Sequence, residues 1–577
     1  MNYSTTASVD TNLAKPGLLQ RLRHLSKDDT IMLVGLLGIV VSMLVALVFP
    51  LVSIFSKSFQ DNEGTFVGLG NFIEYFSSAG LVMSIWNSVG MALGTTVIAG
   101  LMAFIYAYAL TRSCMPGKKI FRALSSIPIL APSLLPAISL VYLFGNQGVI
   151  KEFLMGESIY GIIGIVIGMC FYIFPHVLMI MVTALSTSDA RLYEAAEVLG
   201  AGRVRIFFTV TLPGARYGLI SAGFVAFTLA ITDFGIPKVI GGNFNVLATD
   251  IYKQVVGQQN FSIGAVVGMV LLVPALVSFA VDRHVRKKQT ALLTARSAPY
   301  HPKPHAMRDG ILFVFCVAVV VFLIGILGMA AFSSFVTFWP YDMTLTLNHY
   351  DFDAVDPNGW ASFYNSLKMA GFTAIIGTVL IFTGAYFVEK CQSFKGLRAS
   401  VQMMAMIPMA VPGMVLGLAY VFFFADGDNP FSGIYGTMII LVVATIAHFY
   451  TVSHLTLVTA LKQIDPEFEA VSASLKAPFY KTVARVHFPI CLTAVSDVAI
   501  YLFVNAMTTV SAVVFLYAPD TKLASISVLN MDDVGDQAPA AAMAMMIVLT
   551  SVVVKGLHAL VSRGINARAM AWKTATK

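Results

Sequence analysis

Apolar residues fill this chain in long blocks, and polar residues gather in the stretches between them. A helix that crosses a bilayer needs about 20 mostly apolar residues. In the first half, blocks of that kind run over residues 31–55, 85–110, 127–144, 162–185, 219–235 and 263–281. In the second half they run over residues 311–332, 367–388, 401–424, 437–461, 494–517 and 538–557. The pattern predicts an all-α integral membrane protein with about twelve transmembrane helices.

Composition supports this prediction and excludes an ordinary soluble enzyme. Of the 577 residues, 57% are hydrophobic and only 12% are charged, whereas soluble domains carry about 25% charged residues. Five cysteines are scattered without the C-x-x-C spacing of zinc or redox sites: Cys114, Cys170, Cys316, Cys391 and Cys491. We expect them to pack as small apolar residues, and we expect neither a metal site nor a catalytic residue in the chain.

Basic and acidic residues alternate from one loop to the next, which predicts the orientation of the chain. Basic residues precede the first block and follow the second and the fourth, as at Arg23, Arg112 and Arg191. Acidic residues occupy the intervening loops, as at Asp61 and Asp351. Both termini are therefore expected in the cytoplasm, with the chain in a bacterial inner membrane. The net charge of +7 follows from topology, so lipid is the expected environment and nucleic acid is not an expected partner.

The two halves of the chain repeat each other. Asn87-Ser88 at the start of the second block recurs as Asn365-Ser366, and Thr183-Ala184-Leu185 recurs as Thr459-Ala460-Leu461. Six spans in each copy make the copies parallel, related by an axis along the membrane normal. The expected divisions are a cytoplasmic leader at 1–30, a first half at 31–282 with its core at about 81–282, a basic cytoplasmic linker at 283–309, a second half at 310–560 with its core at about 361–560, and a cytoplasmic tail at 561–577.

The basic loop after the fourth block has the pattern of a docking element. It contains Glu194-Ala195-Ala196, then Gly200, and later Leu212-Pro213. These residues predict a short helix with alanine on its exposed side, a break at the glycine, and a second helical stretch that ends at the proline. Such a helix is suited to lie in a groove of a soluble partner. The chain has no G-x-x-x-x-G-K-[ST] phosphate loop, so we do not expect it to hydrolyse ATP itself.

This loop resembles the coupling loop in the inner-membrane components of binding-protein-dependent ABC importers. The resemblance covers Glu194 to Pro213 position by position. It implies the type I ABC importer permease fold, two copies of a cytoplasmic ABC ATPase that carry the ATP and magnesium, and a periplasmic solute-binding protein. It also implies that Glu194 and Ala195 contact the ATPase, that Gly200 turns the loop, and that Pro213 ends it.

The second copy of the loop departs from this signature. Ala470 stands where the glutamate is expected and Lys476 where the glycine is expected, whereas Pro489 is retained. Two interpretations stay open. Coupling is asymmetric with the first loop dominant, or Glu469, one position early, substitutes for the missing carboxylate.

The fused two-copy arrangement resembles the ferric-iron importer permeases and, more closely, permeases for 2-aminoethylphosphonate uptake. The stretches Phe503 to Ala512 and Asn530 to Asp533 carry the second likeness. It implies a translocation pore for 2-aminoethylphosphonate, with a ferric-iron importer permease as the alternative. A twelve-helix secondary transporter is an alternative of another class, but its ion coupling usually requires intramembrane charges, and these blocks contain almost none.

Polar residues at the ends of the apolar blocks are the candidates for a solute pathway, because such groups are costly in a membrane. Thr232 and Asp233 end the fifth block, and Asn505, Thr508 and Thr509 lie in the equivalent block of the second copy. The Asp233 carboxylate is able to pair with the ammonium group of an aminophosphonate. It is equally able to cap a helix.

Histidines and prolines inside the blocks are given structural roles. We expect His176, His448 and His454 to form interhelical hydrogen bonds. Prolines cluster in the third block of each copy, where broken helices are expected to shape a gate: Pro128, Pro132, Pro136, Pro408 and Pro412.

Overall fold

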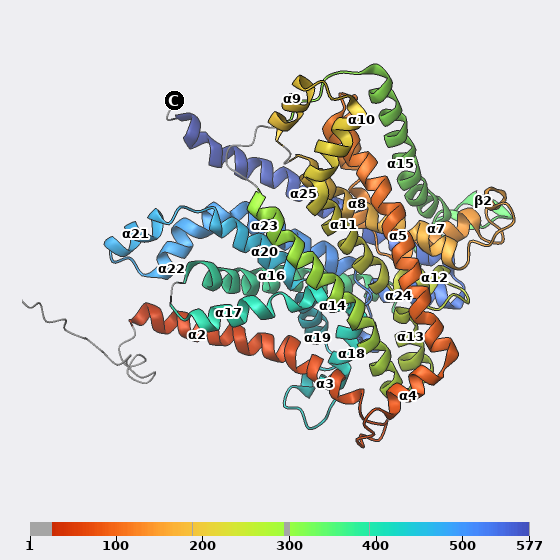
Figure 1. The fold of residues 1–577 in the computed structure, drawn as a ribbon. Helices are drawn as coiled ribbons and strands as arrows, with labels where there is room; N and C mark the ends of the chain where they lie inside the picture. Colours follow the sequence, from red (N-terminus) through yellow and green to blue (C-terminus); the bar gives the residue numbers. More distant parts are fainter. Residues whose placement is uncertain (1–25, 187–188, 293–299, 392, 576–577) are drawn as a thin grey trace, which may run out of the picture.

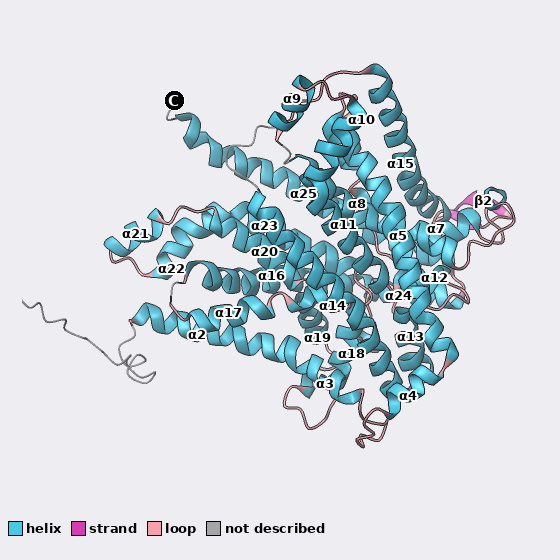
Figure 2. Ribbon diagram, viewed as in Figure 1, coloured by secondary structure: helices cyan, strands magenta, loops and turns pink. Residues whose placement is uncertain are grey.

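The computed structural model describes residues 26–186, 189–292, 300–391 and 393–575. Within them, nine helices are long and apolar enough to cross a membrane, and three bent helix pairs bring the number of spans to as many as twelve. A two-stranded antiparallel sheet is the one sheet of this described part (Figure 2). The prediction of an all-α membrane protein with about twelve spans is confirmed.

The described residues of the first half form thirteen α-helices in the chain order of Figure 1. They are α2 (Lys27–Met43), α3 (Phe49–Lys57), α4 (Gly70–Ser77), α5 (Ala79–Arg112), α6 (Lys118–Leu124), α7 (Leu134–Phe144), α8 (Ile162–Ser186), α9 (Ala190–Val198), α10 (Arg203–Ile206), α11 (Leu212–Thr232), α12 (Gly235–Ile240), α13 (Leu247–Tyr252) and α14 (Phe261–Leu292).

The second half repeats this order after its own first helix. It contains α15 (Ala306–Ser333), β1 (Val336–Phe338), β2 (Asp342–Leu345), α16 (Gly359–Lys390), α17 (Lys395–Met404), α18 (Gly413–Phe424), α19 (Met438–His448), α20 (Tyr450–Lys462), α21 (Glu467–Ser474), α22 (Phe479–Thr482), α23 (Phe488–Thr508), α24 (Ala524–Val534) and α25 (Gln537–Ala575).

Three predicted spans are not straight helices. The third block of each copy is bent, by 102° between α6 and α7 and by 114° between α17 and α18. Pro128 and Pro408 sit in the short 3-10 turns at these bends, because proline cannot donate to the preceding turn and clashes with it. The tenth block is also broken, by 56° between α19 and α20.

Pro213 does not end a helix, contrary to the prediction. Residues 203–232 run as one helical span, with a π turn at Phe207–Thr211 that ends two residues before the proline. The second copy places a π turn at Val483–His487 in front of Pro489. A π turn releases backbone groups locally, so the missing N–H of proline is accommodated without a break.

Several helices do not end where the apolar blocks end. Residues 509–517 lie beyond the end of α23 and are not helical. Helix α14 continues to Leu292 and α15 begins at Ala306, so much of the predicted linker is helix. Helix α25 extends to Ala575 through the predicted tail. Amphipathic or basic helix ends carry no hydropathy signal, which explains why the apolar pattern missed them. Residues 1–25 of the predicted leader lie outside the described residues.

The first helix of each half packs against the other half. Helices α2 and α3 contact α16, α17 and α18, and α15 contacts α5 and α7. Tyr420 in α18 donates a hydrogen bond to the backbone oxygen of Ala46, at 2.5 Å. The two halves are therefore interleaved, so neither half-core is complete without a helix from the other.

The repeated Asn-Ser pair performs the same task in both halves. In α5, Asn87 donates to the oxygen of Asn245 at 3.0 Å and Ser88 accepts from the N–H of Leu247 at 2.8 Å. In α16, Asn365 donates to the oxygen of Asp520 at 2.9 Å and Ser366 accepts from the N–H of Ala524 at 2.8 Å. Each pair thus fixes the start of a short helix, α13 in the first half and α24 in the second.

Ser366→Ala is expected to lower stability by about 1–3 kcal/mol, because the buried N–H of Ala524 loses its acceptor. The measurement is the thermal unfolding midpoint of the detergent-solubilised chain. Thr383→Ala is the control, because the Thr383 hydroxyl is exposed and bonds only within its own helix. Equal midpoints for the two variants would contradict this role of Ser366.

Candidate functional site

A cavity of about 330 Å³ lies between the two halves. Helices α8, α11 and α14 of the first half line it, together with the bend before α7. The second half contributes α19, α23 and the bend before α18. All five residues expected on a solute pathway lie on this one cavity: Thr232, Asp233, Asn505, Thr508 and Thr509.

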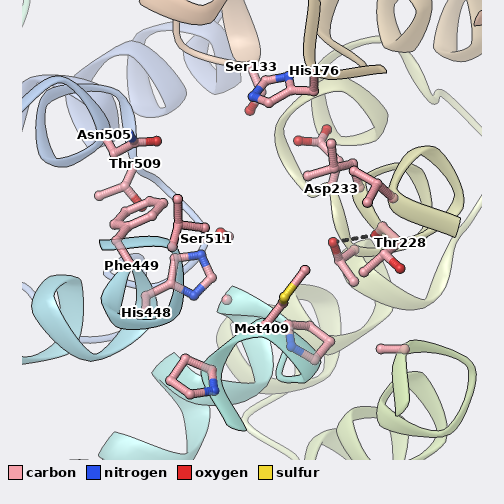
Figure 3. A pocket seen from close by; sticks show the side chains of 18 of the residues that line it. Ser133, His176, Thr228, Asp233, Met409, His448, Phe449, Asn505, Thr509 and Ser511 are labelled. Atoms are coloured by element: carbon pink, nitrogen blue, oxygen red, sulfur yellow. Dashed lines mark hydrogen bonds between the residues drawn. The ribbon is translucent and has the colours of Figure 1, made fainter. Parts of the chain in front are cut away.

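The polar groups are divided between two opposing walls (Figure 3). Asp233 and Thr228 project from the first half, and Asn505, Thr509 and Ser511 face them from the second half. Within the described part of the chain, the hydroxyls of Thr509 and Ser511 form no hydrogen bond, so they are available to a solute. A second carboxylate, Asp282, also lines the cavity, but it accepts a 2.5 Å hydrogen bond from Ser221.

Asp233 is held at the end of α11 by the turn into α12. Its carboxylate accepts a hydrogen bond from the N–H of Ile236 at 3.0 Å and so caps the first turn of α12. The capping interpretation of this residue is confirmed, and it does not exclude a second role. Figure 3 shows the carboxyl group on the cavity surface. A carboxylate has about four acceptor positions, so one bond to the backbone leaves others for a ligand.

Each wall contains one close contact between a serine and a glycine, and the two residues stand in exchanged positions in the two halves. A Cβ atom on Gly235 would lie 2.3 Å from the Ser133 hydroxyl oxygen, and one on Gly413 would lie 2.3 Å from that of Ser511. The serine therefore precedes α7 in the first half but follows α23 in the second half. In both places the glycine lets a bent third-block helix approach the end of a span.

The histidines differ from the prediction in two of three places. His454 lies 3.3 Å from the side chain of Gln402 in α17, so its interhelical hydrogen bond is confirmed. His176 instead bonds within its own helix, to the oxygen of Tyr172 at 3.2 Å. His176 and His448 both line the cavity, because helix breaks and a proline turn these faces inward. Their sequence positions are not equivalent in the two copies, so the repeat gave no signal for them.

An ion pair joins the two halves next to the cavity. Helix α12 begins at cavity-lining Gly235, and one turn further Lys238 pairs with Asp533 of α24 at 2.7 Å. The Lys238 ammonium also lies 5.2 Å from the ring centre of Tyr252, which in turn is 6.3 Å from the ring of Phe515. These contacts lie away from α9 and α21 (Figure 1). No sequence pattern indicated the pairing.

The first loop, residues 189–213, projects from the membrane-spanning part. Asp189 caps α9 by accepting from the N–H of Arg191 at 3.1 Å. Glu194 and Ala195 are exposed, Ala196 is half-buried, and Tyr193 is turned inward to bond with Thr211 at 3.1 Å. After α9, Gly200 adopts a left-handed φ of +74°, Leu212 is half-buried, and Pro213 is exposed.

The second loop, residues 465–489, has the same shape with different chemistry. Ala470 and Pro489 are exposed, and Lys476 takes the left-handed conformation at φ +49° in the place of Gly200. Glu469 occupies the position of Tyr193, not that of Glu194. Its carboxylate lies 2.6 Å from Lys390 and 3.2 Å from buried His487. This places Glu469 beneath the loop helix, where it does not copy an exposed glutamate.

Comparisons with known proteins agree with this geometry. Residues 97–290 and 386–567 match one protein family. That family is described as the binding-protein-dependent transport system inner membrane component. The ferric transport system permease protein FbpB of Actinobacillus pleuropneumoniae is 27% identical over 93% of this chain and 79% of its own length. PhnU of Salmonella typhi, named for 2-aminoethylphosphonate transport, is 22% identical over 41% of this chain and 84% of its own length.

A solved bacterial alginate ABC transporter, in complex with an alginate-bound periplasmic protein, is 17% identical. The match covers 47% of this chain and 98% of that chain, with a TM-score of 0.39.

The repeated fold and the shared polar cavity define a membrane permease built from two fused halves. The chain belongs to the family of inner-membrane components of binding-protein-dependent transport systems. It is a permease subunit of an ABC importer and not an enzyme. Membership of this family decides against the secondary transporter.

The ion pair beside the cavity is expected to restrict access from its side of the membrane. Asp533→Asn removes the charge that holds Lys238 across the two halves. In a chain with Cys114→Ser and a reporter cysteine at cavity-lining Met409, this change is expected to raise labelling by an impermeant thiol reagent several-fold. Asp536→Asn, on the exposed turn after α24, is the matched control. Labelling that stays at the control level would show that the pair does not close the cavity.

Proposed function

We propose that the first and second loops bind a cytoplasmic ABC ATPase, one copy at each loop, and pass its movement to the membrane helices. Each loop presents an exposed leucine directly before its left-handed residue: Leu199 is 85% exposed and Leu475 is 75% exposed. Exposed large apolar side chains grouped on one projection favour a protein partner. The basic residues beside both loops support their placement in the cytoplasm, together with both chain termini.

The two loops differ in how well they suit this role. Helix α9 presents Glu194 and Ala195 on its exposed side, as the family resemblance implies. Helix α21 presents Ala470, and Lys476 holds a backbone conformation that costs an L-residue about 1–2 kcal/mol. These differences favour asymmetric coupling with the first loop dominant.

Gly200→Trp is therefore expected to uncouple ATP hydrolysis from uptake more severely than Lys476→Trp. The substitution strains a position at φ +74° and places a large ring on the docking side. At Lys476 a side chain is already tolerated in that conformation. The measurement is solute uptake per ATP hydrolysed by vesicles that contain the complete transporter. Equal losses in the two variants would refute the asymmetry.

We further propose that the solute is a small zwitterion, 2-aminoethylphosphonate, delivered by a periplasmic binding protein. The observation that supports this is that the Asp233 carboxylate lies on one wall of the cavity and faces hydroxyl, amide and imidazole groups on the other wall. No lysine or arginine lines the cavity in the described residues. An ammonium group pairs well with a carboxylate, and a phosphonate accepts hydrogen bonds from hydroxyls and imidazole.

Ferric iron is the second candidate, and a specific observation favours it. The relative named for ferric transport matches over 93% of this chain, whereas the relative named for 2-aminoethylphosphonate matches over 41%. Oxygen-rich and acidic surroundings also suit a hard cation. Among the described residues, however, no three His, Cys, Asp or Glu side chains are grouped to hold a metal ion.

Uptake of the two solutes by cells that express the complete transporter separates these candidates. We expect saturable uptake of labelled 2-aminoethylphosphonate, which Asp233→Asn lowers about tenfold through loss of a charge-assisted contact. Asp428→Asn, in an exposed loop, is expected to leave uptake unchanged. Uptake of labelled ferric iron without uptake of the aminophosphonate would replace the first proposal with the second.

A further inference from the structure

The segment that enters the second half lies against the first loop. We call residues 300–305 the strap. Lys303 of the strap pairs with Glu197 of α9, with the ammonium nitrogen 2.5 Å from the carboxylate oxygen. The hydrogen bond to the Glu197 carboxylate raises the pKa of Lys303, since it stabilises the charged ammonium form. The strap thus contacts the loop helix directly.

A second contact fixes the strap beneath α9. The guanidinium of Arg112, at the end of α5, lies 4.6 Å from the ring centre of Tyr300 and 5.2 Å from that of Tyr193. The two tyrosine rings are themselves 4.4 Å apart. Arg112 is 3% exposed and donates a hydrogen bond to the oxygen of Leu185 at 2.7 Å. A buried arginine against two rings is a stronger contact than an exposed ion pair.

The strap continues without interruption into α15. The Cys114 thiol lies 3.2 Å from the oxygen of Pro302, and Arg308 in the first turn of α15 donates to the oxygen of Lys303 at 2.7 Å. His305 caps α15 by accepting from the N–H of Arg308 at 3.2 Å. A chain of bonded groups therefore leads from α9 to the first helix of the other half.

The second loop has a crossed contact of the same kind, but a weaker one. Asp28, at the start of α2, accepts from the N–H of Phe479, which begins α22 of the second loop. Asp29 accepts from the hydroxyl of Ser393 at 3.1 Å. In the described part of the chain, no arginine lies between two rings there. The position of Arg112 is taken by Lys390, which pairs with Glu469.

We propose that the strap is a positioning element that holds α9 against α5 and joins it to α15. In the fused chain, a displacement of the first loop is passed directly to the first helix of the second half. Tyr300 and Lys303 are its positioning residues: Arg112 anchors Tyr300, and Glu197 pairs with Lys303. The force-transmitting part of this inference rests on the proposed coupling of α9 to an ATPase, whereas the holding of α9 does not.

Hydrogen exchange of the full chain in detergent tests the holding of α9. Tyr300→Leu combined with Lys303→Glu is expected to speed exchange of the amides at Leu199 and Ala201 about tenfold. These amides close the end of α9 by bonding to the oxygens of Ala195 and Ala196. Exchange in α21 is expected to stay unchanged and serves as the internal reference. Unchanged exchange in α9 would overturn the inference.

Charge reversal separates the ion pair from general damage. Lys303→Glu alone is expected to speed α9 exchange, and adding Glu197→Lys is expected to restore most of the protection. Lys462→Glu is the matched control, because its ammonium lies 3.9 Å from Glu389 and it serves the other half of the chain. If the amides of α9 exchange as fast with the reversed pair as with Lys303→Glu alone, a specific contact between the two side chains would be contradicted.

Uptake per ATP in the complete transporter tests the passing of movement. In the Tyr300→Leu/Lys303→Glu variant, solute uptake per ATP hydrolysed is expected to fall several-fold. In the variant with the reversed charge pair, this value is expected to recover. Loosened α9 with an unchanged ratio would overturn the force-transmitting role. If the unaltered chain showed no ATP-driven uptake, the proposed function would fail, while the exchange result would still decide whether the strap holds α9.

Discussion

Backbone N–H and C=O groups that lose their helical partners cannot be left facing lipid, and this constraint governs the whole structure. A solute pathway needs irregular backbone near the membrane centre, so every freed group requires a protein partner. Asp233 accepts from the N–H that opens α12, and Ser366 accepts from the N–H that opens α24. Ser525 donates to the oxygen of Thr509 at the end of α23. The cavity exists because side chains replace these lost backbone bonds.

The duplicated chain keeps this backbone scaffold in both halves and changes the chemistry placed on it. Asp233 and Thr509 end equivalent helices, yet one wall gains a carboxylate and the other a hydroxyl. Beneath the two loops, the aromatic and guanidinium contacts of Tyr193 and Arg112 correspond to the ionic contacts of Glu469 and Lys390. Fusion into one chain allows such differences, since the two halves do not share one sequence.

Because the first helices are interleaved, each half depends on a helix of the other half to complete its packing. Helices α2 and α3 cover the core of the second half, and α15 covers that of the first. The first turn of α2 and the segment that leads into α15 each touch a loop of the opposite half. Each loop is therefore bonded to its own half through its helices and to the other half through a first helix. The six-plus-six pattern of the sequence says nothing about which half each first helix packs against, and only packing showed the exchange.

The sequence by itself determined the class of protein, the number of spans and the parallel repeat, because hydropathy and self-similarity are local properties of the chain. It also identified the first loop and the five pathway candidates, since polar groups at span ends are rare enough to stand out. The tertiary structure alone decided that these candidates share one cavity, and that His176, His448 and Ser511 join them. Lys238 and Asp533 lie about 300 residues apart in the sequence, and Glu197 and Lys303 lie about 100 residues apart. No local pattern encodes such pairs, because they form only when the packing of two half-cores brings distant segments together.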